Sequence, residues 1–233
     1  MKKFNFSSIV LFVAVLLFHP ACNKENVAPD TGLPPKQMDY ITDNAGKVLY
    51  RFFYENDTIV EFKYFGNYYA YERVEFKYGK LFRYHFPGGH YIQYTFPYHP
   101  NDSVMYIAAD QDSTDLMAIY YFEGNKVVAA TVYPYNSVRV KYKYFYNEAD
   151  NLIRIESFPE GSTTITHYKF THDEAPNPWY GMGIVDDFMS LSKNNYIEIN
   201  DYPYNRYKYN DEGYMIESHN IYTGILKYYY RED

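Results

Sequence analysis

Cys22 is the residue with the most distinctive chemistry, because it is the only cysteine in this chain of 233 residues. A lone cysteine forms no intrachain disulfide, so an exported chain is expected to use its thiol in another way. Lys2 and Lys3 open the sequence, and an apolar run over 8–18 follows that is too short to span a bilayer. This order is typical of a signal peptide, and we predict that residues 1–21 are removed.

Residues 19–22 (His-Pro-Ala-Cys) resemble a bacterial lipobox, although His19 stands where that pattern prefers Leu. The resemblance implies that Cys22 is lipidated, becomes the first mature residue and attaches the chain to a membrane. Lys24 and Glu25 resemble export signals on surface lipoproteins of some Gram-negative bacteria. We therefore expect a protein anchored at the outer membrane, periplasmic or on the cell surface. Residues 22–36, rich in Pro, Asn and charge, are predicted to be a flexible tether.

The histidines and acids elsewhere form no motif with metal-ligand spacing. His85 and His90 flank a turn, and His167 and His172 precede two acids, but neither pair has the third ligand that a metal needs. The stretch 110–115 alternates oxygen donors, yet it lacks the glycine and the distal glutamate of a calcium loop. We predict ordinary strand-end histidines and solvated turns, with no metal and no cofactor.

Catalytic motifs are also missing from the sequence. Asp186 and Asp187 are adjacent acids, but neighbours on a helix point about 100° apart and do not face each other. There is no nucleophile elbow, Walker loop, dinucleotide fingerprint or His-Glu-x-x-His. The net charge of −7 argues against a nucleic-acid partner. We expect no catalytic residues and a binding or structural role, with a glycan, peptide or protein as partner.

Two alternatives stay open at this point. One is a carrier that holds an apolar ligand inside a barrel, which requires an interior void. The other is a glycan hydrolase whose carboxylates come from separate strands, because such a site leaves no local motif.

Aromatic residues are the one surplus that can carry binding, with 32 Tyr and 17 Phe. Aromatic side chains favour strands, and rings presented on a sheet can stack on sugars. Trp179 and Tyr180 lie in a proline-containing stretch that reads as a loop, where binding residues concentrate, and they are the candidate ligand-binding residues. For most tyrosines we expect the simpler role of filling the interior of a rolled sheet.

The elements that must position these residues are short strands with a period of two. Val138–Tyr146 sets Val and Tyr against Arg and Lys, and similar segments recur from residue 37 to residue 233. About fifteen strands joined by tight turns predict an all-β fold, an antiparallel up-and-down meander rolled into a barrel or strongly curved sheet. Rings are expected inside and ions outside. Residues 172–183 are predicted not to be a strand, and an apolar stripe predicts one short helix near 184–192.

The segments Tyr144–Asn151, Tyr168–Asp173 and Tyr207–Gly213 resemble the tyrosine-rich YD repeats of bacterial surface proteins, and the first two begin 24 residues apart. The domain over 37–233 is also similar to a group of uncharacterised lipoproteins of Gram-negative bacteria whose domain is described as porin-like. Asp173, the Asn-Pro loop at 176–178 and Asn194 with Asn195 match their shared features. The resemblance implies a porin-like β-domain and a location, and it supplies no activity.

Overall fold

The computed structural model describes residues 36–66, 72–77, 80–89, 91–95, 104–109, 116–134, 137–182, 184, 188–220 and 224–231. These residues form one antiparallel sheet of seventeen strands. The strands are β1 (Met38–Asp43), β2 (Val48–Glu55), β3 (Thr58–Tyr64), β4 (Arg73–Lys77), β5 (Lys80–His85), β6 (Tyr91–Thr95), β7 (Val104–Ala109), β8 (Leu116–Glu123), β9 (Lys126–Val132), β10 (Val140–Tyr146), β11 (Leu152–Pro159), β12 (Thr166–Pro176), β13 (Asn194–Ile199), β14 (Tyr202–Pro203), β15 (Asn205–Tyr209), β16 (Met215–Asn220) and β17 (Gly224–Tyr230).

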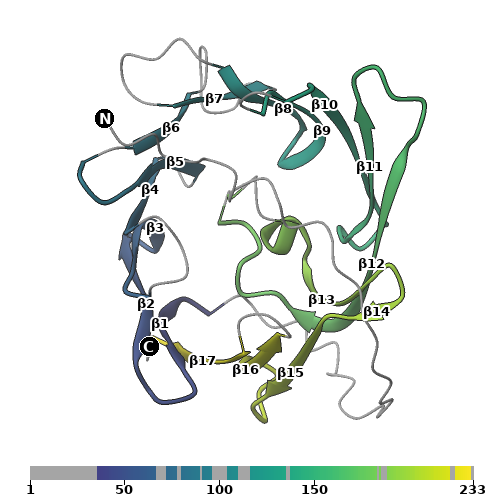
Figure 1. Cartoon of the computed structure of the whole chain (residues 1–233). Helices are drawn as coiled ribbons and strands as arrows, with labels where there is room; N and C mark the ends of the chain where they lie inside the picture. The colour runs from purple at the N-terminus through teal and green to yellow at the C-terminus, as the bar shows by residue number, and fades with distance from the viewer. Residues whose placement is uncertain are drawn as a thin grey trace.

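The sheet rolls up because consecutive strands in the described part of the chain pair with each other, except β14 with β15, and the first strand also pairs with the last. In the β1–β17 ladder, Ile41 lies opposite Tyr228. Viewed along the axis, the strands run round a ring (Figure 1). No ladder joins β14 to β15 among the described residues, and there the Tyr204 N–H donates to the Ile197 carbonyl at 2.8 Å. The predicted all-β meander, rolled into a strongly curved sheet, is confirmed.

Tight turns allow this up-and-down course. Asn56 and Asp57 join β2 to β3 with φ values of 47° and 61°, and Asn200 and Asp201 join β13 to β14 with 53° and 66°. Both central residues of each turn are thus left-handed, as in the hairpin turns whose twist matches that of paired strands. Asn and Asp tolerate this conformation better than other non-glycine residues.

Side chains alternate between the inside and the outside of the ring. In β3, Phe62 and Tyr64 are buried while Glu61 and Lys63 point outward. The residue opposite Tyr54 is Ile59, because a β-bulge shifts the register there. Val60 therefore does not share the buried face with Phe62, against the simple alternation of the sequence. Rings such as that of Tyr94, which is only 1% exposed, fill the interior as predicted, whereas Phe53 and Tyr229 are exposed on the outside.

The short helix expected near 184–192 is present as a single 3-10 turn. The described part of this stretch contains only η2, a 3-10 turn over Phe188–Leu191, which lies inside the ring (Figure 1). The Ser190 hydroxyl donates to the Ile184 carbonyl, and the Asn177 amide donates to the Ser192 carbonyl at 2.9 Å. The side chains of Ser190 and Asn177 thus take the place of helical N–H groups as hydrogen-bond donors to these two backbone carbonyls. The apolar stripe still points into the core, with Ile184 buried.

The expectation that residues 172–183 hold no strand is wrong for residues 172–176, because β12 continues to Pro176. Its pairing with β13 is irregular, with register shifts before and after His172. Bulges let a strand accommodate residues that break the ladder, including a proline at its end. Within the described ranges, no helix has the length and apolar character needed to cross a membrane.

Candidate functional site

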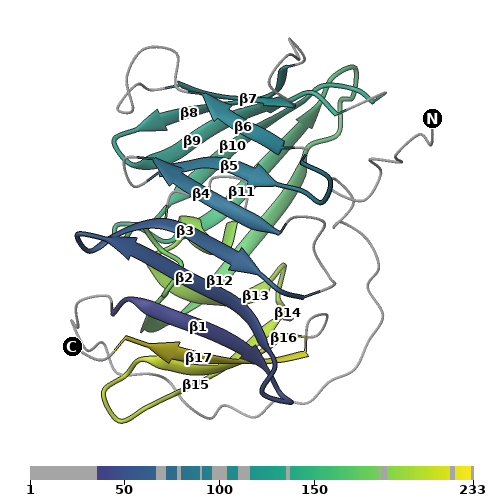
Figure 2. The ribbon, with the colours of Figure 1, turned by 90° about the vertical axis from the view of Figure 1, so that its left-hand side faces the viewer.

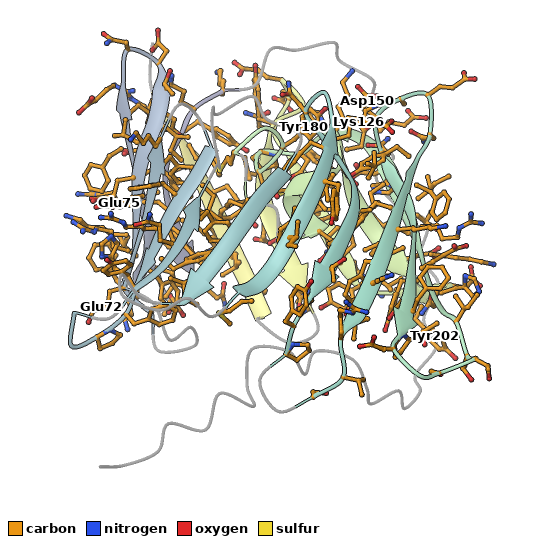
Figure 3. All side chains as sticks on the ribbon, turned by 90° about the horizontal axis from the view of Figure 1, so that it is seen from above. Glu72, Glu75, Lys126, Asp150, Tyr180 and Tyr202 are labelled. Carbon is orange, nitrogen blue, oxygen red and sulfur yellow. The ribbon has the colours of Figure 1, made fainter. Side chains whose placement is uncertain are left out.

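The two predicted ligand-binding residues, Trp179 and Tyr180, point to different surroundings. Trp179 is half-buried inside the ring, where its indole meets Tyr50, Phe52 and Phe62 edge-on at centroid distances of 5.9, 5.7 and 6.4 Å. Tyr180 is 40% exposed and lies at one rim of the ring, near Lys126 and Asp150 (Figure 3). The structure therefore gives Trp179 a packing environment and leaves Tyr180 open to solvent.

Asn177 holds the turn that carries Trp179. Its side-chain oxygen accepts the backbone N–H of Trp179 at 3.0 Å, and its backbone carbonyl accepts the N–H of Tyr180 at 3.1 Å. Its own N–H donates to the Lys193 carbonyl at 2.9 Å, which ties the turn to the residue before β13. This is the local hydrogen bonding by which Asn stabilises a turn over its own following residues. Asn177 is buried, so the turn belongs to the interior.

Beside this turn, Asp173 of β12 lies in a polar network with Tyr209 of β15. The Tyr209 hydroxyl donates to Oδ2 of Asp173, and the Ala175 N–H donates to Oδ1 at 3.0 Å. The Asn195 amide donates to the Tyr209 hydroxyl at 3.3 Å. Burial raises the pKa of Asp173 to about 6, although these hydrogen bonds lower it in part. Burial and the Asp173 carboxylate raise the pKa of Tyr209 well above its usual value.

The neighbouring His172 has the opposite shift. Its Nε2 lies 3.0 Å from the Ser192 hydroxyl, whose oxygen accepts the N–H of Leu152 at 3.0 Å. A neutral imidazole can form this hydrogen bond with the hydroxyl in either direction, depending on its tautomer. Burial lowers the pKa of His172 to about 4. Two adjacent titratable residues are thus both held toward their neutral forms inside the ring.

A small void, too small for a water molecule, lies next to this network. Its lining, within the described residues, is Asn177, Trp179, Asn195, Tyr196, Tyr207, Met215 and Tyr228. The Tyr207 hydroxyl donates to the Tyr196 carbonyl at 2.9 Å, and the Tyr228 hydroxyl lies 2.9 Å from that of Ser218. Both of these hydroxyls are therefore paired within the interior, as in networks that select one packing of a core.

Other residues singled out in the sequence do not come together. His167 is exposed on the outer wall, 3.6 Å from Glu156, whereas His172 faces inward. His85 is 3.0 Å from Glu75 on the outer wall. Among the described residues, no group of three His, Cys, Asp or Glu side chains could hold a metal ion.

Several predictions lie outside the described residues. These are the signal peptide 1–21, Cys22, the tether over 22–35, His90, the acidic stretch 110–115, and Asp186 with Asp187.

A second group of residues became visible only through the strand register. One line of outward positions crosses seven neighbouring strands from β17 through β1 to β6 (Figure 2). We call it the cationic row, and its members in order are Tyr229, Tyr40, Arg51, Lys63, Arg73, His85 and Tyr91. The alternation in the sequence places Lys63, Arg73 and His85 on the outer face, whereas rings such as those of Tyr40, Tyr91 and Tyr229 are expected inside. The sequence also does not say which of these positions are neighbours.

The next line of outward positions places Glu61 opposite Glu75. Glu61 lies 3.4 Å from Lys63 and 3.4 Å from Arg73, and Glu75 lies 2.9 Å from Arg73. Figure 3 shows Glu75 on the outside of the wall. Cations therefore separate two carboxylates that would otherwise repel each other across the strands.

The fold defines an all-β protein with a single rolled antiparallel sheet and a loop inserted into its interior. No family model matches the chain. No curated protein matches it either. Among solved structures, a porin-like protein from Bacteroides vulgatus ATCC 8482 is similar, with 13% identity and a TM-score of 0.35. The match covers 85% of this chain and 100% of that one. The two chains superpose only loosely.

Proposed function

We propose that this protein is a lipid-anchored protein of the cell envelope that binds a partner on the outer wall of its rolled sheet without converting it. The observation that carries this proposal is the cationic row, where tyrosines, one of them the exposed Tyr229, flank a run of Arg, Lys and His. Aromatic and Arg side chains are the residues that most often carry binding energy at surfaces. The interior supports the same assignment, because its rings pack on one another and on Trp179.

The outer wall suits a domain that stands in water beside a membrane. Lys63 and Arg73 are 44% and 38% exposed on β3 and β4, and Arg154 is exposed on β11. A wall that faced lipid would present an apolar band instead. A lipid on Cys22 and the tether over 22–36 would then provide the membrane attachment.

Nothing in the described residues favours the carrier or the hydrolase. The void beside Trp179 cannot hold an apolar ligand, and Glu61 and Glu75 are both engaged by cations. We therefore keep binding as the proposed function.

Lipidation is tested by growing cells with an alkyne-tagged fatty acid. We expect the full chain to be labelled and to fractionate with membranes, and the Cys22→Ser variant to lose both properties. Labelling of the variant would refute the anchor.

Binding is tested with the full chain in detergent, immobilised and exposed to neutral and anionic polysaccharides, peptides and envelope proteins. We expect a Tyr40→Ala, Tyr229→Ala double variant to lose binding, because these two rings stack on the outer wall at a centroid distance of 4.4 Å. Tyr202→Ala is the matched control, since Tyr202 is exposed at the opposite rim from Tyr180 (Figure 3). Equal losses in both variants, or no binding to any member of the panel, would contradict the proposal.

A further inference from the structure

The cationic row has the chemistry of a site for a negatively charged polymer. We propose that it binds an anionic polysaccharide that lies across the strands from β1 to β6. This inference rests on the proposed binding function and names the class of partner.

The spacing of the row is set by the sheet. Arg51, Lys63, Arg73 and His85 occupy directly opposed positions on β2, β3, β4 and β5. Neighbouring strands lie about 4.8 Å apart, so the row presents a basic side chain at each step. A linear polymer with a charge on its repeating unit can meet several of these side chains at once, and each charge-assisted contact adds to affinity.

Aromatic rings hold two of the cations in this wall without neutralising them. The Arg51 guanidinium lies over the Tyr40 ring at 6.0 Å, and Arg83, in the adjoining line, lies over the Tyr91 ring at 4.9 Å. Among the described residues, neither Arg51 nor Arg83 forms an ion pair with a carboxylate. A cation packed on a ring keeps its charge available to a ligand, although the Nε of Arg83 also donates to the side-chain oxygen of Gln93 at 2.9 Å.

The charge of this wall differs from that of the whole chain. The protein has a net charge of −7, yet Arg51, Lys63, Arg73 and Arg83 outnumber Glu61 and Glu75 in the two central lines of the wall. Acidic residues lie instead at turns, for example Glu55 and Asp57. A positive wall on an acidic protein attracts an anion locally, and the acids at its rim repel a ligand that is placed elsewhere.

Two features favour a polysaccharide over a nucleic acid. Glu61 and Glu75 lie within the wall, where they can accept hydrogen bonds from the hydroxyl groups that every sugar unit carries. Tyr229 is 39% exposed beside Tyr40, which offers an aromatic surface at the end of the row.

The test compares polygalacturonate with neutral dextran as ligands for the immobilised full chain, measured by biolayer interferometry. The variant is Arg51→Gln with Arg83→Gln. The matched control is Lys143→Gln with Arg154→Gln, which removes the same charge from β10 and β11, where these cations lie over Phe158 and Phe145 at 5.5 and 4.1 Å. All four side chains are on the outer wall, and far-ultraviolet circular dichroism checks that the variants stay folded.

We expect polygalacturonate to bind and dextran not to bind, with an affinity that falls as salt rises. The Arg51, Arg83 variant should bind about 10-fold more weakly or worse, since a hydrogen bond to a charged group contributes roughly 1.5–3 kcal/mol. The control pair should bind as the unaltered chain does.

Each other outcome overturns the inference in a different way. Equal binding of dextran would leave the proposed binding function intact and refute the anionic specificity. Equal weakening of the control pair would show general charge attraction instead of a site at the row. Tighter binding of a single-stranded DNA of similar length would assign the wall to nucleic acid. Failure of every polysaccharide, with binding of a peptide or protein from the wider panel, would refute this inference alone.

Discussion

The adjacent residues His172 and Asp173 make a sharp prediction about stability and pH. His172 has its pKa lowered to about 4, and Asp173 has its pKa raised to about 6. The perturbations are two single variants, His172→Gln and Asp173→Asn, each of which removes one titration and keeps a polar side chain of similar size.

The signs follow from proton binding in the folded and unfolded states. Between pH 4 and 6, Asp173 keeps its proton only when folded, so its contribution to stability is present at low pH and is lost as pH rises through its folded pKa. Between pH 4 and 6.5, His172 binds a proton only when unfolded, so its contribution is present above that range and is lost as pH falls. Each shift corresponds to about 3 kcal/mol across its range, and the two nearly cancel in the unaltered protein.

The measurement is urea unfolding from pH 4 to pH 7, followed by the fluorescence of Trp179, the only tryptophan. Other titrating groups are common to all three proteins, so the informative quantity is the difference in unfolding free energy from the unaltered chain. Between pH 4 and pH 7, we expect the unfolding free energy of Asp173→Asn to rise by about 3 kcal/mol relative to that of the unaltered chain. We expect the unfolding free energy of His172→Gln to fall by about as much over the same range. A difference that stays constant with pH for either variant would refute the reasoning for that residue.

Three further predictions concern packing and turns. Trp179→Ala should cost about 3–5 kcal/mol of unfolding free energy, because it removes a ring that packs against Tyr50 and Phe52 inside the sheet; circular dichroism in urea measures it, and a loss below 1 kcal/mol would contradict a packing role. Tyr228→Phe should cost about 1 kcal/mol by removing the buried hydroxyl pair with Ser218, and a neutral result in the same assay would show that the pair is not needed. Asp201→Gly should raise the unfolding free energy by about 0.5–1 kcal/mol, because glycine relieves the φ of 66°. This gain should appear as a slightly higher melting temperature, and a lower melting temperature would count against that turn geometry.

The sequence predicted the parts of the fold that depend on neighbours along the chain. Alternation in Val138–Tyr146 reports which side chains face inward, because a strand has a period of two. Turn residues such as Asn56 and Asp57 mark the hairpins, because few residues adopt a positive φ. These local rules suffice for an antiparallel meander that rolls up.

Other features depend on contacts between distant residues and could not be predicted. The β1–β17 ladder joins Ile41 to Tyr228, and no local pattern encodes that pairing. The spacing of apolar residues at 184–191 fits a longer helix than the 3-10 turn that forms at Phe188–Leu191. Around this turn, the side chains of Asn177 and Ser190 donate hydrogen bonds to backbone carbonyls. The cationic row exists only because the register aligns one position from each strand, which a shift of one residue would undo.

The pairing of the first strand with the last has a consequence for how the molecule forms. The edge of β1 lacks its second partner until β17 has been synthesised, so that edge stays open until then. Gln37 and Arg231 are hydrogen-bonded at 2.7 Å, so the two ends of the described fold meet. A circular permutant that joins these ends and opens the chain at the Asn200–Asp201 turn should therefore reach the same ring with its last-formed seam in a different place.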